Sequence, residues 1–170
     1  DGTATATTVA LAAEAALHEL IERDAVVEWS AGGLIACMAD TIDLSSVPFD
    51  WAHYWRDRVE QAGASLRFYR TPSLTGSPVI VCEINDFAKE GGGDGAGHGR
   101  GCHAFPEMAL FKALAEAIQS RATLIAGARE DALSCFYAAR PRNRVPVAFA
   151  LPLPPGRTGV AWSGIAPGPI

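Results

Sequence analysis

The strongest structural signal in the chain is a helical pattern over residues 106–127. Proline suits the first turn of a helix, where its missing N–H costs nothing, and glycine is common just past a helix end, so Pro106 and Gly127 mark the two limits. The apolar side chains between them recur at the intervals of one helix face: Leu110, Phe111, Leu114, Ile118 and Ile125. A long helix with one apolar face is expected to pack on another layer of structure.

Arg121 interrupts this apolar face. Its projected angle lies between those of Leu110 and Leu114, where an unpaired cation is expensive to bury. The guanidinium therefore needs an anion or a route to water. A structural salt bridge and a site for a bound anion both meet that need, and the sequence leaves the two interpretations open.

A second long helix is predicted near the start of the chain, over residues 8–29. Its spacing predicts one buried stripe, which comprises Ala13, Leu17, Leu20, Ile21 and Ala25. The other face carries polar side chains among apolar ones, namely Leu11, Ala15, His18, Glu19 and Glu22, with Arg23 at its edge. Charges at these intervals are common on solvated helix faces, yet the leucine and alanine argue against full solvation. The face could be an ordinary surface or could hold a ligand.

The middle of the chain contains further predicted elements. A helix over residues 50–63 has Asp50 as its expected N-cap and Gly63 as its stop. Strands are predicted over 65–71 and 77–87, and the second has an apolar centre from Val79 to Cys82. Residues 88–102 are expected to form a flexible glycine-rich loop. A short helix over 128–140, one more strand and a proline-rich tail over 151–170 follow.

Length and composition exclude several classes of protein. A chain of 170 residues with 49% hydrophobic content builds one core, so residues 1–170 are expected to form a single unit. The net charge is −5 and no basic stripe occurs, which argues against a nucleic-acid partner. No apolar run reaches the roughly 18 residues of a membrane-spanning helix. Four scattered cysteines and the lack of a secretory signal indicate a reduced, cytoplasmic protein.

Three weaker patterns compete with ordinary explanations. The glycine-rich segment lacks G-K-[S/T], so glycine content alone does not indicate a phosphate-binding loop. His98, Cys102 and His103 suggest a metal, but no fourth ligand is spaced for zinc. Cys102 next to His103 suggests a thiol–imidazole pair, although adjacent loop residues rarely present their side chains to each other.

Two stretches far apart in the chain each carry a recognisable motif. Residues 16–25 read ALHELIERDA, and residues 99–131 read GRGCHAFPEMALFKALAEAIQSRATLIAGARED. The first gives E-x-x-E-R-D-A, and the second gives G-x-G-x-H followed by A-x-x-E-A-x-Q-S-R-x-x-x-x-x-G-x-R-x-D. In this order the two motifs resemble the signatures of the YcaO-domain family, and the resemblance covers most of the chain. It implies an α+β fold in which long helices pack on a modest mixed β-sheet.

The resemblance also implies an activity. Members of the family bind ATP and Mg²⁺ in a carboxylate-rich site and phosphorylate a peptide-backbone amide, which leads to azolines, thioamides or amidines. By carry-over, Glu19 and Glu22 match the carboxylates at the metal and nucleotide, and Arg23, Gln119 and Arg121 match nucleotide-side residues. No residue is singled out as catalytic. The implied partners are a peptide or protein substrate and a TfuA-type or leader-peptide-binding protein.

The chain also departs from the family pattern. Thr7 stands where the family has asparagine and Leu11 where it has glutamate, and a leucine cannot bind Mg²⁺. The family's S-x-x-E-x-x-E motif is expected before position 1, so the N-terminal part of the domain is expected to be absent. Two hypotheses follow: the chain is part of an ATP-dependent modifying enzyme, or it is a non-catalytic domain that binds peptide or scaffolds such an enzyme. An apolar face left uncovered would favour a homodimer.

Overall fold

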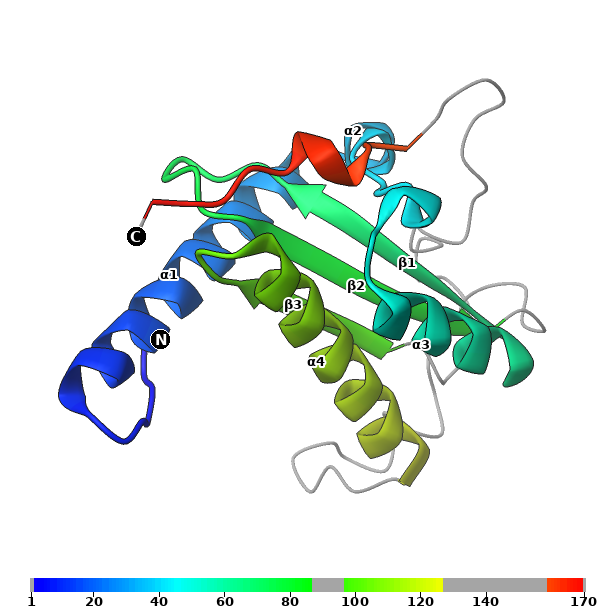
Figure 1. The fold of residues 1–170 in the computed structure, drawn as a ribbon, viewed down its shortest axis with the longest axis horizontal. Coiled ribbons are helices and arrows are strands. Elements are labelled where there is room, and N and C mark those ends of the chain that lie inside the picture. The colour runs from blue at the N-terminus through cyan, green and yellow to red at the C-terminus, as the bar shows by residue number, and fades with distance from the viewer. Residues whose placement is uncertain (1, 87–96, 127–158, 170) are drawn as a thin grey trace.

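The protein has an α+β fold in which helices cover both faces of one sheet (Figure 1). The structure is a computed structural model and describes residues 2–86, 97–126 and 159–169. The predicted fold class is confirmed. In chain order the elements are α1 (Val9–Ala31), α2 (Leu34–Ala39), η1 (Leu44–Ser46), α3 (Asp50–Gln61), β1 (Ala64–Thr71), β2 (Val79–Asp86), β3 (Gly97–Cys102), α4 (Pro106–Ala126) and η3 (Trp162–Gly164).

The three described strands form an antiparallel sheet in the order β1-β2-β3. Parallel pairing within the described residues is limited to an isolated bridge between Ile42 and Val160. Helices α3 and α4 lie on one face of the sheet, and α1 crosses the other (Figure 1). Because side chains alternate along a strand, each face has its own core.

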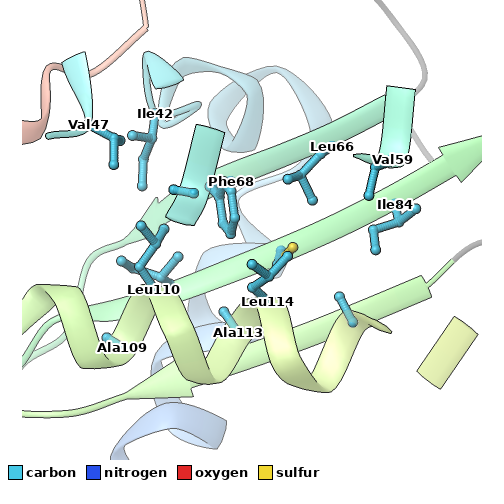
Figure 2. Close-up of a cluster of buried hydrophobic side chains, with 14 of the residues drawn as sticks. Ile42, Val47, Val59, Leu66, Phe68, Ile84, Ala109, Leu110, Ala113 and Leu114 are labelled. Carbon is cyan, nitrogen blue, oxygen red and sulfur yellow. The ribbon is translucent and has the colours of Figure 1, made fainter. Parts of the chain in front are cut away.

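The larger core lies between the sheet and the α3–α4 layer. Figure 2 shows Phe68 of β1 and Ile84 of β2 directed toward Leu110 and Leu114 of α4. Phe68, Leu110 and Leu114 are almost fully buried, and each large side chain of this kind contributes roughly 1.5–3 kcal/mol by leaving water. The apolar face predicted for residues 106–127 is confirmed at Leu110 and Leu114, whereas Phe111 remains half exposed.

Strand β3 corrects the prediction of a flexible loop over residues 88–102. Residues 97–102 form a strand, and residues 88–96 lie outside the described part of the chain. A Cβ added at Gly97, Gly99 or Gly101 would lie 2.4, 2.0 or 2.1 Å from a backbone oxygen of α4. The glycines therefore let the helix backbone rest directly on the strand. The alternating glycines of residues 97–101 therefore indicate close packing, not flexibility. The short helix expected over 128–140 and residues 151–158 of the expected tail also lie outside the described residues.

Helix α1 is rotated relative to the sequence prediction. Its buried residues are His18, Ala25, Val26 and Trp29, and Ala25, Val26 and Trp29 pack against Tyr69, Val79, Val81 and Cys102 in the second core. The predicted stripe is confirmed at Ala25 and at Ile21, which packs against this core, but it is wrong at Leu17 and Leu20, which are 56% and 50% exposed. Trp29 and Ala25 anchor the helix, and their spacing places His18 and Glu22 on the face toward the sheet. Val9, Leu17, Leu20 and Val27 leave an apolar strip on the outer side. The homodimer remains a prediction.

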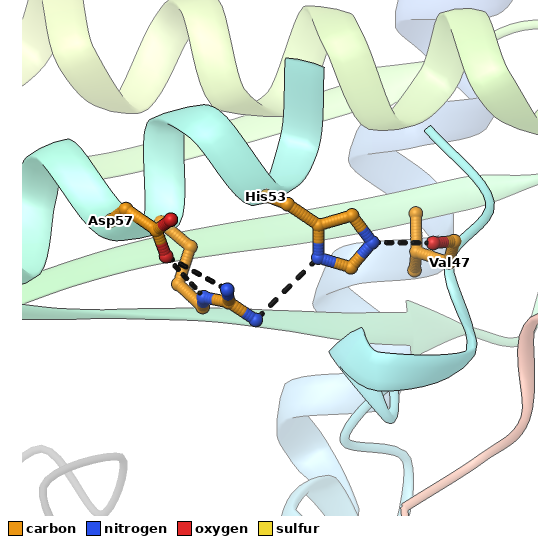
Figure 3. A network of polar contacts seen from close by, with 4 residues as sticks. Val47, His53 and Asp57 are labelled. Atoms are coloured by element: carbon orange, nitrogen blue, oxygen red, sulfur yellow. Dashed lines mark hydrogen bonds and ion pairs between the residues drawn. The ribbon is translucent and has the colours of Figure 1, made fainter. Parts of the chain in front are cut away.

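Helix α3 begins at its expected cap residue, one residue earlier than predicted. Asp50 is the first helical residue and Phe49 holds the N-cap position, so the carboxylate acts on the positive end of the helix and not as a side-chain cap. Figure 3 shows how α3 is tied to the preceding segment: His53 Nε2 lies 2.7 Å from the Val47 carbonyl oxygen. Arg56 donates to Asp57 at 2.7 and 2.9 Å in the same network. Gly63 ends the helix with φ +77°, as predicted.

The described part of the chain contains no helix long and apolar enough to cross a membrane. Its three cysteines, Cys37, Cys82 and Cys102, are free thiols and buried.

A carboxylate is buried on the α1 side of the sheet. Glu83 is 1% exposed, and its oxygens lie 3.5 Å from Tyr69 Oη, 3.4 Å from Asn85 Nδ2 and 3.4 Å from His98 Nδ1. Burial raises the pKa of Glu83, although His98, Asn85 and Arg67 act in the opposite direction. The long contacts leave the desolvation of its charge incompletely compensated.

Replacing Glu83 with glutamine is expected to stabilise the fold by about 1 kcal/mol at pH 7–8. A carboxyl with a raised folded-state pKa is penalised when ionised, so the penalty is absent below the ordinary value of 4.5, grows as pH rises from there to the folded-state pKa, and is constant above it. The glutamine side chain keeps the size without the charge, and its carbonyl oxygen can still accept from Tyr69 and Asn85. Urea unfolding at pH 4 and pH 8 measures the difference, and a less stable Glu83→Gln variant at pH 8 would contradict this account.

Candidate functional site

The candidate site lies at the free edge of β3, where α1 and α4 pass on opposite faces of the described sheet. Side chains of α4 reach around this edge. Glu116 accepts a hydrogen bond of 2.8 Å from the Arg100 backbone N–H, and Lys112 Nζ donates at 2.9 Å to the Cys102 carbonyl. Lys112 and Glu116 share one side of α4 because they are four residues apart.

At this edge the charge of Glu116 on α4 acts on the carboxyl group of Glu22 on α1. The Glu22 side chain is partly buried, and burial first and the Glu116 carboxylate second raise its pKa. Lys112 and Arg100 partly offset this rise. Glu22 and Glu116 form a carboxylate pair, and the charges of Lys112 and Arg100 act on Glu22. A partly buried carboxylate whose pKa is raised by a second carboxylate is typical of sites that bind a cation or carry out acid–base chemistry.

Glu19 and Arg23 form an ion pair with each other on the outer side of α1. Arg23 Nη2 lies 2.8 Å from Glu19 Oε1, and the two side chains are 54% and 29% exposed for Arg23 and Glu19. Desolvation acts to raise the pKa of Glu19, but the hydrogen bond from Arg23 and its charge lower it overall. This pair follows the ordinary i,i+4 pattern of a helix surface, which was the simpler of the two predicted interpretations.

The anion that the sequence analysis required for Arg121 is a carboxylate of the protein itself. Its Nη2 lies 2.6 Å from Asp86 Oδ1 at the end of β2, and both side chains are about one-fifth exposed at 20% and 21%. The structural salt bridge is thus the state seen in this structure. Gln119 is exposed on the side of α4 that carries Glu116, and its carbonyl accepts a hydrogen bond from Thr123. Glu22 thus belongs to the carboxylate pair, and the charge of Glu19 acts on it. Arg121 is instead paired with Asp86 at the end of β2.

Three residues of the site were missed by sequence reasoning: Arg100, Lys112 and Glu116. Glu116 is the glutamate of A-x-x-E-A-x-Q-S-R, and its three-residue distance from Gln119 could have placed it on the same helix face. Nothing in the local pattern pairs Arg100 or Lys112 with α1, because that contact depends on the two helices meeting at one sheet edge.

The carboxylate pair suits a magnesium ion bound together with a nucleotide. Mg²⁺ keeps several waters and binds proteins through one or two carboxylates together with substrate phosphates. The described residues contain no group of three or more His, Cys, Asp or Glu arranged as a complete metal site. Two carboxylates that repel each other at this edge nevertheless supply the one or two protein ligands that Mg²⁺ needs beside substrate phosphates. A cation bound between them would relieve the repulsion.

The alternative metal and thiol patterns are not assembled within the described residues. His98 faces Glu83, and Cys102 is fully buried with burial raising the pKa of its thiol to about 11. His103 Nδ1 accepts a 3.1 Å hydrogen bond from the Phe105 N–H. A thiol with a raised pKa is a poor source of thiolate, so Cys102 and His103 lack the character of a nucleophilic pair.

Comparison with known sequences identifies the family of this α+β domain with an acidic site. The sequence profile described as YcaO cyclodehydratase, ATP- and Mg²⁺-binding, matches residues 1–153. The chain therefore belongs to the YcaO family. The prediction of ATP and Mg²⁺ as cofactors is confirmed at the level of this family description. A curated relative from Rhizobium leguminosarum bv. trifolii, named "Uncharacterized protein in tfuA 3'region", is 32% identical over 136 residues, which are 77% of this chain and 32% of that protein.

Solved structures share the fold. The heterocyclase TruD superposes with a TM-score of 0.68 at 19% identity, over 98% of this chain and 22% of its own. A heterocyclase in complex with substrate and cofactor gives 0.60 at 22% identity, over 68% and 15%. YcaO from Methanopyrus kandleri, bound with AMPPCP and Mg²⁺, gives 0.53 at 22% identity, over 72% and 31%. The chain spans less than one-third of the length of each of these relatives.

Proposed function

We propose that this chain is part of an ATP- and Mg²⁺-dependent YcaO-type enzyme that activates peptide-backbone amides by phosphorylation. The products would be azolines, thioamides or amidines in a peptide or protein. The observation that carries the proposal is the carboxylate pair of Glu22 and Glu116, which faces Lys112 and Arg100 at the edge of β3. Carboxylates that hold Mg²⁺ and cations that stabilise phosphate charge are the groups that phosphoryl transfer requires.

Each side chain of the site has a separate proposed role. Glu22 and Glu116 would hold Mg²⁺, and Lys112 and Arg100 would compensate phosphate charge. When bound, the metal would neutralise charge on the nucleotide. Glu19 would add a carboxylate at the margin of the site, as the sequence resemblance implies.

Arg23, Gln119 and Arg121 remain proposed nucleotide-side residues. Arg23 and Arg121 already pair with Glu19 and Asp86, so a phosphate would have to compete with those carboxylates. Gln119 is exposed and offers a side-chain amide near Glu116.

The proposed partners are a peptide substrate and a TfuA-type or leader-peptide-binding protein. A heterocyclase of the same fold was solved with substrate and cofactor, and the name of the Rhizobium relative refers to the tfuA 3' region. Both observations support the proposal without assigning a substrate. A cytoplasmic location remains part of the prediction from cysteine usage.

One observation favours a second candidate function, a non-catalytic peptide-binding or scaffolding domain. Helix α1 is intact at Leu11, and this leucine is 49% exposed where the family pattern has a metal-side glutamate. An exposed alkyl group there cannot replace a carboxylate ligand. Under this alternative the fold persists but Mg²⁺-dependent nucleotide binding is lost.

Calorimetric titration of the 170-residue chain with AMPPCP, with and without Mg²⁺, tests the proposal. The expected result is saturable binding that depends on Mg²⁺. Absence of binding at millimolar AMPPCP, or binding of equal strength without Mg²⁺, would contradict the proposal and support the scaffolding alternative.

The role of Arg121 is tested in the same titration. If Arg121 leaves Asp86 to bind phosphate, Arg121→Ala weakens binding by about tenfold or more, the size of a lost charge-assisted hydrogen bond. Arg56→Ala is the matched control because Arg56 also pairs with an aspartate, Asp57, but lies on α3. Equal affinity in the two variants would show that the Arg121–Asp86 pair is purely structural.

A further inference from the structure

A cavity of about 560 Å³ lies beside the carboxylate pair, between α1 and the turn that joins β1 to β2. Its volume falls within the range of about 300–1,000 Å³ that small-molecule sites occupy. The walls are formed by Glu14, Leu17, His18, Ile21, Thr75, Ser77, Ala104 and Pro169. Half of these side chains are aliphatic, so an occupant would gain by burying apolar surface.

Two largely buried polar side chains line the cavity. His18 is 9% exposed and Ser77 is 6% exposed. Within the described residues neither the His18 ring nor the Ser77 hydroxyl makes a hydrogen bond, and the ring stacks at 5.3 Å on His103. The fully enclosed side-chain atoms without a partner in this part of the chain belong to Arg70 and Thr71, so the polar atoms of His18 and Ser77 are open to the cavity, where a ligand can hydrogen-bond to them.

The charges around the cavity limit what it can bind. The His18 ring nitrogens and the Ser77 hydroxyl supply hydrogen-bond donors and acceptors to the cavity. Glu14 is the charged carboxylate among the residues that line the cavity, and it would repel an anion. A cation would lose hydration against aliphatic walls with only an exposed carboxylate to compensate it. An uncharged ligand with both a donor and an acceptor fits best.

The cavity adjoins the candidate nucleotide site. His18 and Glu22 are one helical turn apart on α1, and the charge of Lys112 acts on both side chains. A backbone amide supplies one N–H and one carbonyl, which match the open groups of His18 and Ser77. We propose that this cavity binds one residue of the substrate peptide, with its aliphatic side chain against Leu17 and Ile21 and its amide at His18 and Ser77. The identity of the ligand as a peptide rests on the proposed function.

The test is an NMR titration of the full chain with N-acetyl-leucinamide as the probe. The His18 imidazole signals are expected to shift saturably, and the leucine methyls are expected to show NOEs to Leu17 and Ile21. Ser77→Ala should weaken binding about threefold to tenfold, as loss of one neutral hydrogen bond does. Ser30→Ala on the same helix α1, whose hydroxyl donates to Val27, is the matched control and should bind as the unaltered chain does.

N-acetyl-leucine, which carries a carboxylate in place of the amide, separates amide recognition from simple apolar burial. It should bind at least about fivefold more weakly because Glu14 opposes the added charge. Equal binding of the two probes, shifts that never saturate, or unchanged affinity in Ser77→Ala would each overturn the inference. The titration contains neither nucleotide nor Mg²⁺, so its failure is independent of a failure of nucleotide binding.

Discussion

Gly99→Ala is expected to be the most damaging single-methyl substitution in the described part of the protein. An ideal Cβ at this position lies 2.0 Å from the Ala113 carbonyl oxygen and 2.3 Å from the Ala117 nitrogen, both of which are backbone atoms of α4. Flexible side chains cannot relieve the clash, so the whole helix must move away from β3 and open the core around Leu110 and Leu114. We expect a loss of more than about 4 kcal/mol, which is exceptional for one substitution.

Thermal unfolding followed by circular dichroism measures this effect. For a domain of this size the expected loss corresponds to a drop in Tm of at least about 10 °C, and the variant could fail to fold because native domains hold only about 5–15 kcal/mol. Gly164→Ala is the matched control, since its added Cβ would meet no atom closer than 3.9 Å. A Gly99→Ala variant that melts together with this control would show that α4 does not rest on the β3 backbone.

Glu22→Gln is expected to change nucleotide binding and stability in opposite directions. Because burial and Glu116 raise the pKa of Glu22, its ionised form is unfavourable in the folded chain above the ordinary value of 4.5. Glutamine removes this penalty, so Tm should rise by about 1–2 °C at pH 8. At pH 4, where the carboxyl is largely protonated in both states, the gain should disappear. A carboxylate retained at a cost to stability is typical of a functional site.

The same variant should weaken Mg²⁺-dependent AMPPCP binding about 10- to 100-fold, because one of the two carboxylates proposed to hold the ion is neutralised. Glu116→Gln should have a similar effect on binding while its amide oxygen still accepts the Arg100 N–H. Glu28→Gln, an exposed carboxylate on the same helix, is the control and should alter neither property. Stabilisation without loss of binding would leave Glu22 as a buried charge with no role in the site.

The local elements could be predicted from sequence because their signals are local. Pro106 and the leucines that follow it define α4, and the apolar run from Val79 defines β2. Strand β3 was missed because it carries glycine at alternate positions, which local patterns read as a loop. What makes those glycines ordered is the contact with α4, and sequence alone does not record that contact.

The candidate site was predicted in part for the same physical reason. Family motifs pointed to Glu22, and Glu116 was visible within the motif but not selected. The orientation of α1 could not be inferred, since Leu17 and Leu20 look like core residues until Trp29 and Ala25 dock on the sheet. The sequence indicated that Arg121 needs an anion, but only the fold could show that Asp86, at the end of β2, supplies it.

The hydrogen bond from Arg100 to Glu116 also affects how the chain associates with other chains. In the described sheet β3 is the outer strand, and open backbone groups on such a strand recruit strands from other molecules. Glu116 and Lys112 occupy one N–H and one carbonyl of that strand. A carboxylate proposed to hold the metal thus also guards against intermolecular strand pairing, so altering position 116 to change ligand preference would at the same time make the protein more prone to aggregate.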